Sequence, residues 1–203
     1  MKTLIIYAHL LAACVAIGIL LIQDLAIIRS RGAPLSKGAI NELIKSARIV
    51  SVALVFLWVS GALLVVLGYF ENPQQYLLNQ KLWAKFTVVL ILTINGVFLH
   101  YYSFPRVTGT HGLLNLSVVE QVLVTLSGAV SSVSWLFACY LGIARPWNDT
   151  VDFSYIMSIY MSILIVAIIF SCELLRFLRR EELPLLTDRI QLGTIRSIER
   201  KTK

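Results

Sequence analysis

Residues 5–23 read IIYAHLLAACVAIGILLIQ, an apolar run with one histidine, His9, four positions after its start. A helix needs about 20 predominantly apolar residues to cross the hydrocarbon core of a bilayer. Backbone polar groups must be satisfied within hydrocarbon, so a run that crosses it is expected to be helical. The stretch therefore predicts a membrane-spanning helix with a histidine inside the bilayer.

Four further apolar runs follow in the 203-residue chain, which is 58% hydrophobic and only 14% charged. An average soluble protein has about a quarter of its residues charged. The sequence thus predicts an all-α, multi-pass bundle of five transmembrane helices within residues 1–175, with a basic tail at 176–203. The expected spans lie at about 3–28, 49–70, 82–103, 117–143 and 154–175.

Lysine and arginine residues are unevenly distributed between the two sides of this bundle. Fourteen of the 18 lie in the segments 29–48 and 104–116 and in the tail, which five spans place on one side. By the positive-inside rule, the amino terminus is expected outside and the carboxyl terminus in the cytoplasm. The net charge of +7 then indicates a lipid bilayer as partner, and no nucleic acid is expected. Within the first loop, the apolar spacing of residues 40, 43, 44 and 47 predicts an amphipathic helix on the cytoplasmic interface.

Soft or borderline metal ligands are predicted to gather in the outer half. His9 is about 9 Å below the outer edge of its span and Met161 about 10 Å, at 1.5 Å per residue. Met157 lies one turn before Met161, and Cys139 is near the outer end of the fourth span. Imidazole, thioether and thiol suit Cu(I) or haem iron. The alternative is that His9 makes an interhelical hydrogen bond and that the methionines are packing residues.

A second polar group is expected near the cytoplasmic end: Asp24, His100, Glu120 and Glu173. Glu120 begins a stripe on the fourth span that continues with serines 127, 131 and 134. Ionisable residues within spans often mark proton or ion pathways. The alternative is that charges at helix ends pair with arginine while serines let helices approach closely.

Motifs of soluble-type catalysis are absent from the sequence. It has no Walker loop, no nucleophile elbow and no zinc-protease helix, which excludes a soluble-type hydrolase or an ATPase. Whether the chain is an enzyme stays open on these grounds.

Two stretches resemble the CopD-like and HemJ-like group of small bacterial membrane proteins: YAHLLAACVAIGILL in the first span and KLWAKFTVVLILTINGVFLHYYSFP in the third. The resemblance covers roughly residues 1–105 and implies a bacterial inner membrane. It also implies His9 as a haem b or copper ligand, with Lys85 beside it contacting a propionate or a substrate anion. Trp83 stands where the HemJ-like motif has a histidine, and the fifth span is additional to the four-span HemJ-like pattern.

Three functions are consistent with these features. The first is a haem b or other redox-metal site, centred on His9 with Met161 or Met157, for electron transfer or an oxidoreductase reaction with quinone or porphyrin. The second is a membrane carrier for Cu(I) or another small ion. The third is a non-catalytic subunit or assembly factor of a membrane complex, or a homo-oligomer, in which the polar residues join helices.

Overall fold

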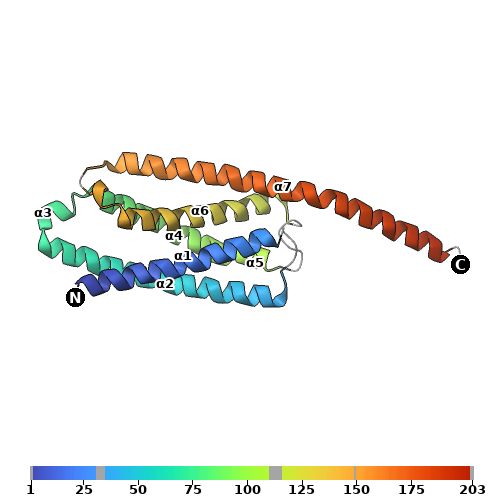
Figure 1. Ribbon diagram of the computed structural model, residues 1–203, viewed down its shortest axis with the longest axis horizontal. Coiled ribbons are helices and arrows are strands. Elements are labelled where there is room, and N and C mark those ends of the chain that lie inside the picture. The colour runs from blue at the N-terminus through green and yellow to red at the C-terminus, as the bar shows by residue number, and fades with distance from the viewer. Residues whose placement is uncertain (1, 31–34, 110–115, 149, 202–203) are drawn as a thin grey trace.

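A computed structural model of the chain describes residues 2–30, 35–109, 116–148 and 150–201, and this part is helical without strands. The long helices are α1 (Lys2–Arg29), α2 (Lys37–Glu71), α4 (Gln80–Phe98), α6 (Val118–Ile143) and α7 (Phe153–Lys201). Short elements join or extend them: α3 (Pro73–Tyr76), the π-helix η1 (Leu99–Ser103), α5 (Phe104–Val107) and the 3-10 turn η3 (Arg145–Trp147). Figure 1 shows the long helices side by side in one elongated bundle.

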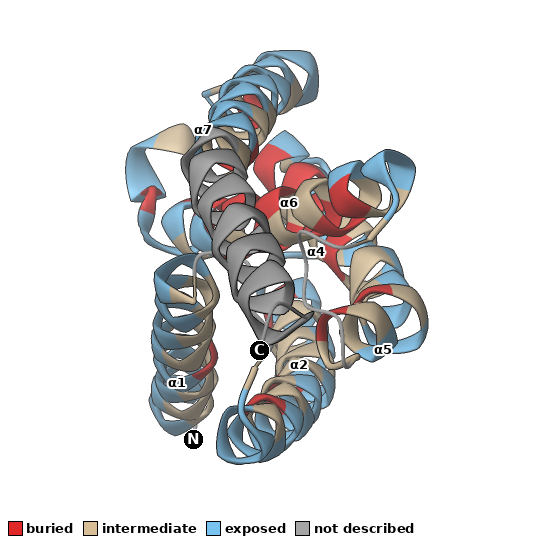
Figure 2. Cartoon of the chain, turned by 90° about the vertical axis from the view of Figure 1, so that its right-hand side faces the viewer, coloured by how far each residue is buried: buried red, intermediate tan, exposed pale blue. Residues whose placement is uncertain are grey.

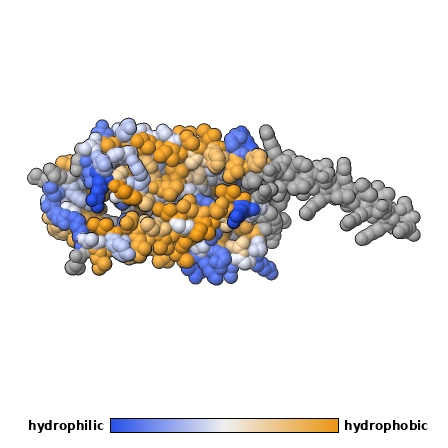
Figure 3. Space-filling model, in the orientation of Figure 1, coloured by the Kyte–Doolittle hydropathy of each residue, from blue (hydrophilic) through white to orange (hydrophobic). Residues whose placement is uncertain are grey.

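Five helices in the described chain are long and apolar enough to cross a membrane, as the sequence predicts. They cover Lys2–Arg29, Lys37–Glu71, Gln80–Val107, Val118–Ile143 and Phe153–Phe177. Many large apolar side chains on the bundle are exposed, such as Leu78 at 76% and Phe70 at 77%. Figure 3 shows the resulting apolar surface across the middle of the bundle, with hydrophilic residues toward its two ends. An exposed apolar surface of this kind suits lipid as the surrounding solvent.

Two elements differ from the sequence-based expectation. Residues 37–47 do not form a separate amphipathic helix, because α2 runs unbroken from Lys37 to Glu71. Ser36 caps its start by accepting a hydrogen bond from the backbone N–H of Ala39, at 3.2 Å. The tail likewise continues α7 as helix to Lys201 (Figure 1). Both helices therefore extend well past the lengths that hydropathy alone indicates.

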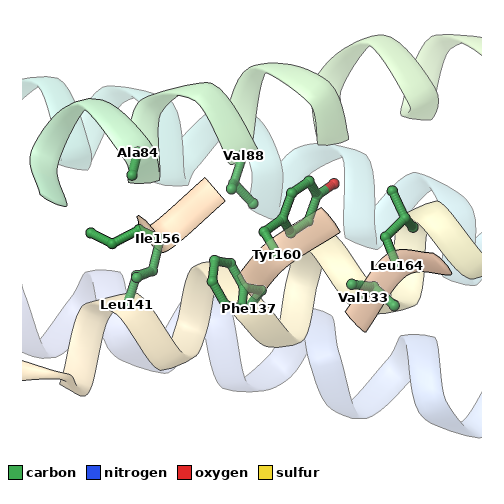
Figure 4. Packing of buried hydrophobic residues seen from close by; sticks show 8 residues of the cluster. All are labelled: Ala84, Val88, Val133, Phe137, Leu141, Ile156, Tyr160 and Leu164. Atoms are coloured by element: carbon green, nitrogen blue, oxygen red, sulfur yellow. The ribbon is translucent and has the colours of Figure 1, made fainter. Parts of the chain in front are cut away.

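The bundle consists of two units. We call α1 and α2, which pack mainly against each other, the hairpin unit; α4, α6 and α7 pack together as the three-helix unit. The core of the three-helix unit is a cluster of eight buried apolar residues that face one another in Figure 4: Ala84, Val88, Val133, Phe137, Leu141, Ile156, Tyr160 and Leu164. Burial in Figure 2 is accordingly densest on α6 and sparse on α1 and α2.

The hairpin unit meets the three-helix unit through two small apolar clusters, one of which joins Leu43 of α2 to Val124 of α6, and through a few polar contacts. The other cluster lies farther along the bundle. Ala16 and Ala53 pack there with Leu92 and Trp135, and we call these four residues the apolar plug. The Trp58 indole donates to the Thr93 hydroxyl at 3.0 Å. Because small side chains dominate the hairpin side of this contact, the backbones approach closely there.

The π-helix η1 interrupts the third span near its end. Pro105, which follows it, has no backbone N–H and cannot close the ordinary i to i−4 bond. The chain instead closes a wider turn, in which the Phe104 N–H donates to the Leu99 carbonyl. The extra residue in this turn shifts the register of the side chains from His100 to Ser103.

The turn after α2 depends on one glycine. A Cβ atom at Gly68 would overlap the ring of Tyr76, whereas one at Gly18 would meet nothing within 4 Å. We expect Gly68→Ala to lower the free energy of unfolding in detergent by about 1–3 kcal/mol, the usual cost of overpacking. Gly18→Ala should cause no loss. Removing the ring with Tyr76→Ala should restore most of the Gly68→Ala loss; an unchanged loss in that background would contradict the contact.

Candidate functional site

A cavity of about 360 Å³ lies between the hairpin unit and the three-helix unit. All five long helices contribute to its wall, and Figure 2 looks along the bundle that they form. Most of the lining side chains are aliphatic, and the polar ones include Gln23, Asp24, Ser46, His100, Ser103 and Ser132. A volume of this size is within the range of small-molecule sites, about 300–1,000 Å³.

Asp24 is the only acidic side chain among the described residues that line the cavity, and no lysine or arginine lines it. The Ser132 hydroxyl of α6 donates to the Asp24 carboxylate at 2.5 Å, so this bond joins the two units. Within the described chain, Asp24 makes no ion pair. An ionised carboxylate is costly in an apolar interior unless a positive charge lies close to it. With only a hydroxyl as its partner, the half-buried Asp24 side chain is therefore expected either to hold a proton or to attract a cation.

Two further polar contacts fix the wall around Asp24. The Gln23 amide donates to the Ser46 hydroxyl at 2.8 Å and holds α1 against α2. Across the cavity, the register shift of η1 places both His100 and Ser103 in the lining. Ser103 is hydrogen-bonded to Ser127 of α6 at 2.9 Å, whereas His100 is exposed and therefore lies at the edge of the cavity. π-turns of this kind frequently occur at functional sites.

The apolar plug borders the cavity. Leu92 and Trp135 belong both to the plug and to the cavity lining, and Trp135 is only 4% exposed. His9 lies seven residues before Ala16 on α1, about 10 Å away along the helix at 1.5 Å per residue. Along α1, Ala16 of the plug therefore lies between His9 and Asp24.

The four residues predicted to form an ion path divide into two groups. Asp24 and His100 line the same cavity. Glu120 instead pairs with Arg106 at 3.0 Å and completes a capping box with Ser117 at the start of α6. Glu173 is exposed and pairs with Arg176, one turn away on α7, at 2.6 Å. Both therefore follow the alternative interpretation, pairing with arginine: Glu120 at the start of α6, and Glu173 within α7, near the end of its apolar part.

Near the amino-terminal end of α1, His9 is hydrogen-bonded to Ser60 of α2, with 2.7 Å between Nδ1 and Oγ. The Ser60 hydroxyl donates to the Phe56 carbonyl at 2.7 Å, so its oxygen accepts from His9 Nδ1–H. This bond fixes the tautomer and leaves a lone pair on Nε2. The ring also lies against the α2 backbone, since its Cε1 is 3.6 Å from the position a Cβ atom would take at Gly61. The predicted interhelical bond exists, and it leaves one nitrogen able to bind a metal.

The other predicted ligands lie at different places around His9. Lys85 is within electrostatic range of His9 and of Cys139, so these three side chains share one region of the bundle. Met157 packs against the core of the three-helix unit, and Met161 is 46% exposed. The described residues contain no group of three or more His, Cys, Asp or Glu side chains arranged to hold a metal ion. The haem and copper hypotheses stay predictions, with His9 Nε2 as the group that fits a metal best.

Several cavity residues are not identifiable from the sequence. The predicted serine stripe includes Ser127 and Ser134, which bond to Ser103 and Tyr160, whereas Ser132 makes the contact with Asp24. Asp24 and Ser132 come from helices distant in sequence, so no spacing relates them. Gly96 and Gly128 also line the cavity, but glycine is common in membrane helices that have no cavity beside them.

No family model, curated protein or solved structure matches the chain.

Proposed function

We propose that the chain is a multi-pass protein of a bacterial inner membrane that binds a small, largely apolar cation in the cavity around Asp24. The amino terminus lies outside and the carboxyl terminus in the cytoplasm, as the distribution of lysine and arginine indicates. The observation that supports the proposal most is the lone acidic side chain in a wall whose lining is mostly aliphatic. We further propose that binding is one step of carrying this cation across the membrane.

The chemistry of the cavity favours a cation with an apolar body. A carboxylate attracts positive charge more strongly in a low-dielectric interior than in water. The aliphatic side chains around it, such as Leu20, Leu54 and Leu92, favour an organic cation over a hydrated metal ion, because they offer no ligands to replace water. Ser132 and Gln23 hold the carboxylate and its surroundings in place.

The two-unit architecture favours a carrier over a simple receptor. The hairpin unit touches the three-helix unit at the apolar plug, at a second apolar cluster that includes Leu43 and Val124, and at a few polar contacts, one of which is the Asp24–Ser132 bond itself. A ligand that takes over the Asp24 carboxylate competes with that bond. Occupation of the cavity is thereby linked to the contact between the two units, and movement of one bundle against another is how many carriers expose a site alternately.

Tetraalkylammonium ions provide a direct test, because they combine one positive charge with an apolar body of adjustable size. The purified protein in neutral detergent is titrated by calorimetry with the series from tetramethylammonium to tetrabutylammonium. We expect affinity to rise with alkyl length until the cavity is filled. Absence of binding throughout the series, with the protein folded, would refute the proposal.

A haem b or redox-metal site at His9 is the second candidate, and the fixed tautomer of His9 favours it. A ligating histidine commonly donates its other N–H to a fixed acceptor, as His9 does to Ser60. The residues present therefore fit an imidazole-bound metal, whether copper or haem iron. A haem bound to His9 would agree with the resemblance to the CopD-like and HemJ-like group and with an electron-transfer role.

Two measurements on the purified protein test this second candidate: absorption spectra before and after reduction with dithionite, and elemental analysis. If His9 binds haem, the reduced α-band of a b-type haem should appear in the wild type and in His100→Ala, and vanish in His9→Ala. A colourless protein with stoichiometric copper would indicate the copper site. A metal-free, colourless protein would leave His9 as an interhelical contact; co-purifying partners would then favour the role of subunit or assembly factor.

A further inference from the structure

The hydroxyl of Ser132 on α6 has two acceptors within reach. Its Oγ lies 2.5 Å from Asp24 Oδ2 and 3.1 Å from the backbone carbonyl oxygen of Gly128, four residues earlier on α6. A serine hydroxyl carries one proton, so it can donate a full hydrogen bond to only one of them, whereas its oxygen can also accept a bond. Which way the Asp24–Ser132 bond points therefore depends on whether Asp24 holds a proton.

This arrangement provides hydrogen bonds for both protonation states of Asp24. When the carboxylate is ionised, the Ser132 hydroxyl donates to it. When the carboxyl group is protonated, its O–H donates to Ser132 Oγ, and the serine hydroxyl donates to the Gly128 carbonyl, as serines within helices can do. Each O–H group has an acceptor in both states, so gain or loss of the proton requires no rearrangement of α6.

Few other titratable groups face Asp24. Of the described residues that line the cavity from α2, from α4 with η1 and α5, from α6 and from α7, His100 is the one titratable side chain. It is exposed and lies at the edge of the cavity. The described wall thus contains no permanent positive charge that would keep Asp24 ionised while no cation is bound.

The charge in the cavity limits which states the protein occupies. With a proton, the Asp24 side chain is neutral; with a bound cation, its negative charge is compensated. An ionised Asp24 without a cation faces a mostly aliphatic wall, and charge in such surroundings is costly. Movement of the hairpin unit against the three-helix unit is therefore most favourable in the two compensated states.

We propose that a proton and the organic cation occupy Asp24 in turn, so that the protein exchanges one for the other. As the cation binds, the O–H bond of the protonated carboxyl group breaks, the carboxylate keeps the electron pair, and the proton passes to water. The reverse reaction on the other side of the membrane returns a proton to Asp24 and releases the cation. This inference rests on the proposed function and adds the proton as a second substrate of the same site.

Calorimetric titration of the full-length protein in neutral detergent with tetrabutylammonium tests the exchange. A quaternary ammonium ion has no proton to lose, so every proton released comes from the protein. Titrations in two buffers that differ in heat of ionisation count the protons released per bound cation. We expect about one proton at about pH 5.5, and binding at least about tenfold weaker there than at about pH 8, because the carboxyl group must first lose its proton.

Two variants identify the group that releases the proton. In His100→Gln, the number of protons released per bound cation should stay near that of the wild type; a loss would assign the proton to His100 and overturn the proposal. In Asp24→Asn, any residual binding should release no proton and should not depend on pH. Persistent proton release in this variant would also overturn the proposal.

The wild-type titrations distinguish failure of the exchange from failure of the proposed function. If tetrabutylammonium binds with the same affinity at both pH values and releases no proton, the exchange is wrong and the proposed cation site stands. If it does not bind at either pH, the proposed function is wrong and the exchange is wrong with it.

Discussion

We expect the Asp24→Asn variant to lose at least about tenfold in affinity for tetrabutylammonium, equivalent to about 1.4 kcal/mol. Asparagine keeps the shape of the side chain and an oxygen that can accept from Ser132. It removes the negative charge, which is the only one among the described residues of the cavity wall. The loss therefore measures the electrostatic part of the interaction, and calorimetric titration of both proteins determines it.

Two control variants distinguish the effect of the lost charge on cation binding from the effect of a changed local structure. Asp152→Asn removes an exposed acidic side chain outside the cavity and should bind as the wild type does. Ser132→Ala removes the hydroxyl on Asp24 but leaves the charge, so binding should persist within a few-fold. If Asp24→Asn binds tetrabutylammonium as the wild type does, the cavity does not recognise charge and the proposed function is wrong.

The second large effect is expected from filling the cavity. Gly128 of α6 lines it, and a Cβ atom there would meet nothing within 4 Å. A leucine at this position should therefore enter open space rather than collide with a neighbouring helix. We expect Gly128→Leu to abolish detectable tetrabutylammonium binding while the thermal unfolding temperature in detergent stays the same or rises.

Gly18→Leu is the matched control, because Gly18 also has nothing within 4 Å but is exposed and does not line the cavity. It should bind the cation as the wild type does. Gly96→Leu offers an independent repeat from α4, since Gly96 lines the same cavity with equal room. Normal binding in both Gly128→Leu and Gly96→Leu would place the ligand elsewhere.

Hydropathy predicts the five helices because crossing a bilayer requires length and apolar composition, and both are local properties of the chain. Hydropathy does not predict how far α2 and α7 extend. A helix continues beyond its apolar segment wherever its backbone hydrogen bonds remain favourable. Residues 37–47 show this: their amphipathic spacing is genuine, yet a cap at Ser36 and an unbroken backbone make them the first turns of α2.

The candidate site is harder to predict, because it depends on contacts between helices distant in sequence. The rarity of ionisable residues within spans singles out Asp24 and His100, and these do share a cavity. Position along the spans also groups Glu120 and Glu173 with them. Position along a span does not say, however, toward which side of its helix a residue points. Both glutamates in fact pair with arginines. For His9, the partner Ser60 lies 51 residues away on the opposing helix, so no local pattern indicates it.

Protection of Asp24 from a hydrophobic carbodiimide tests the central claim most directly. Such reagents add covalently to protonated carboxyl groups in apolar surroundings, and mass spectrometry locates the adduct in the wild-type protein. The account predicts modification of Asp24 that falls steeply when tetrabutylammonium is present at saturating concentration, because the cation occupies the cavity beside the carboxylate. Modification of Asp24 that is the same with and without the cation would contradict it.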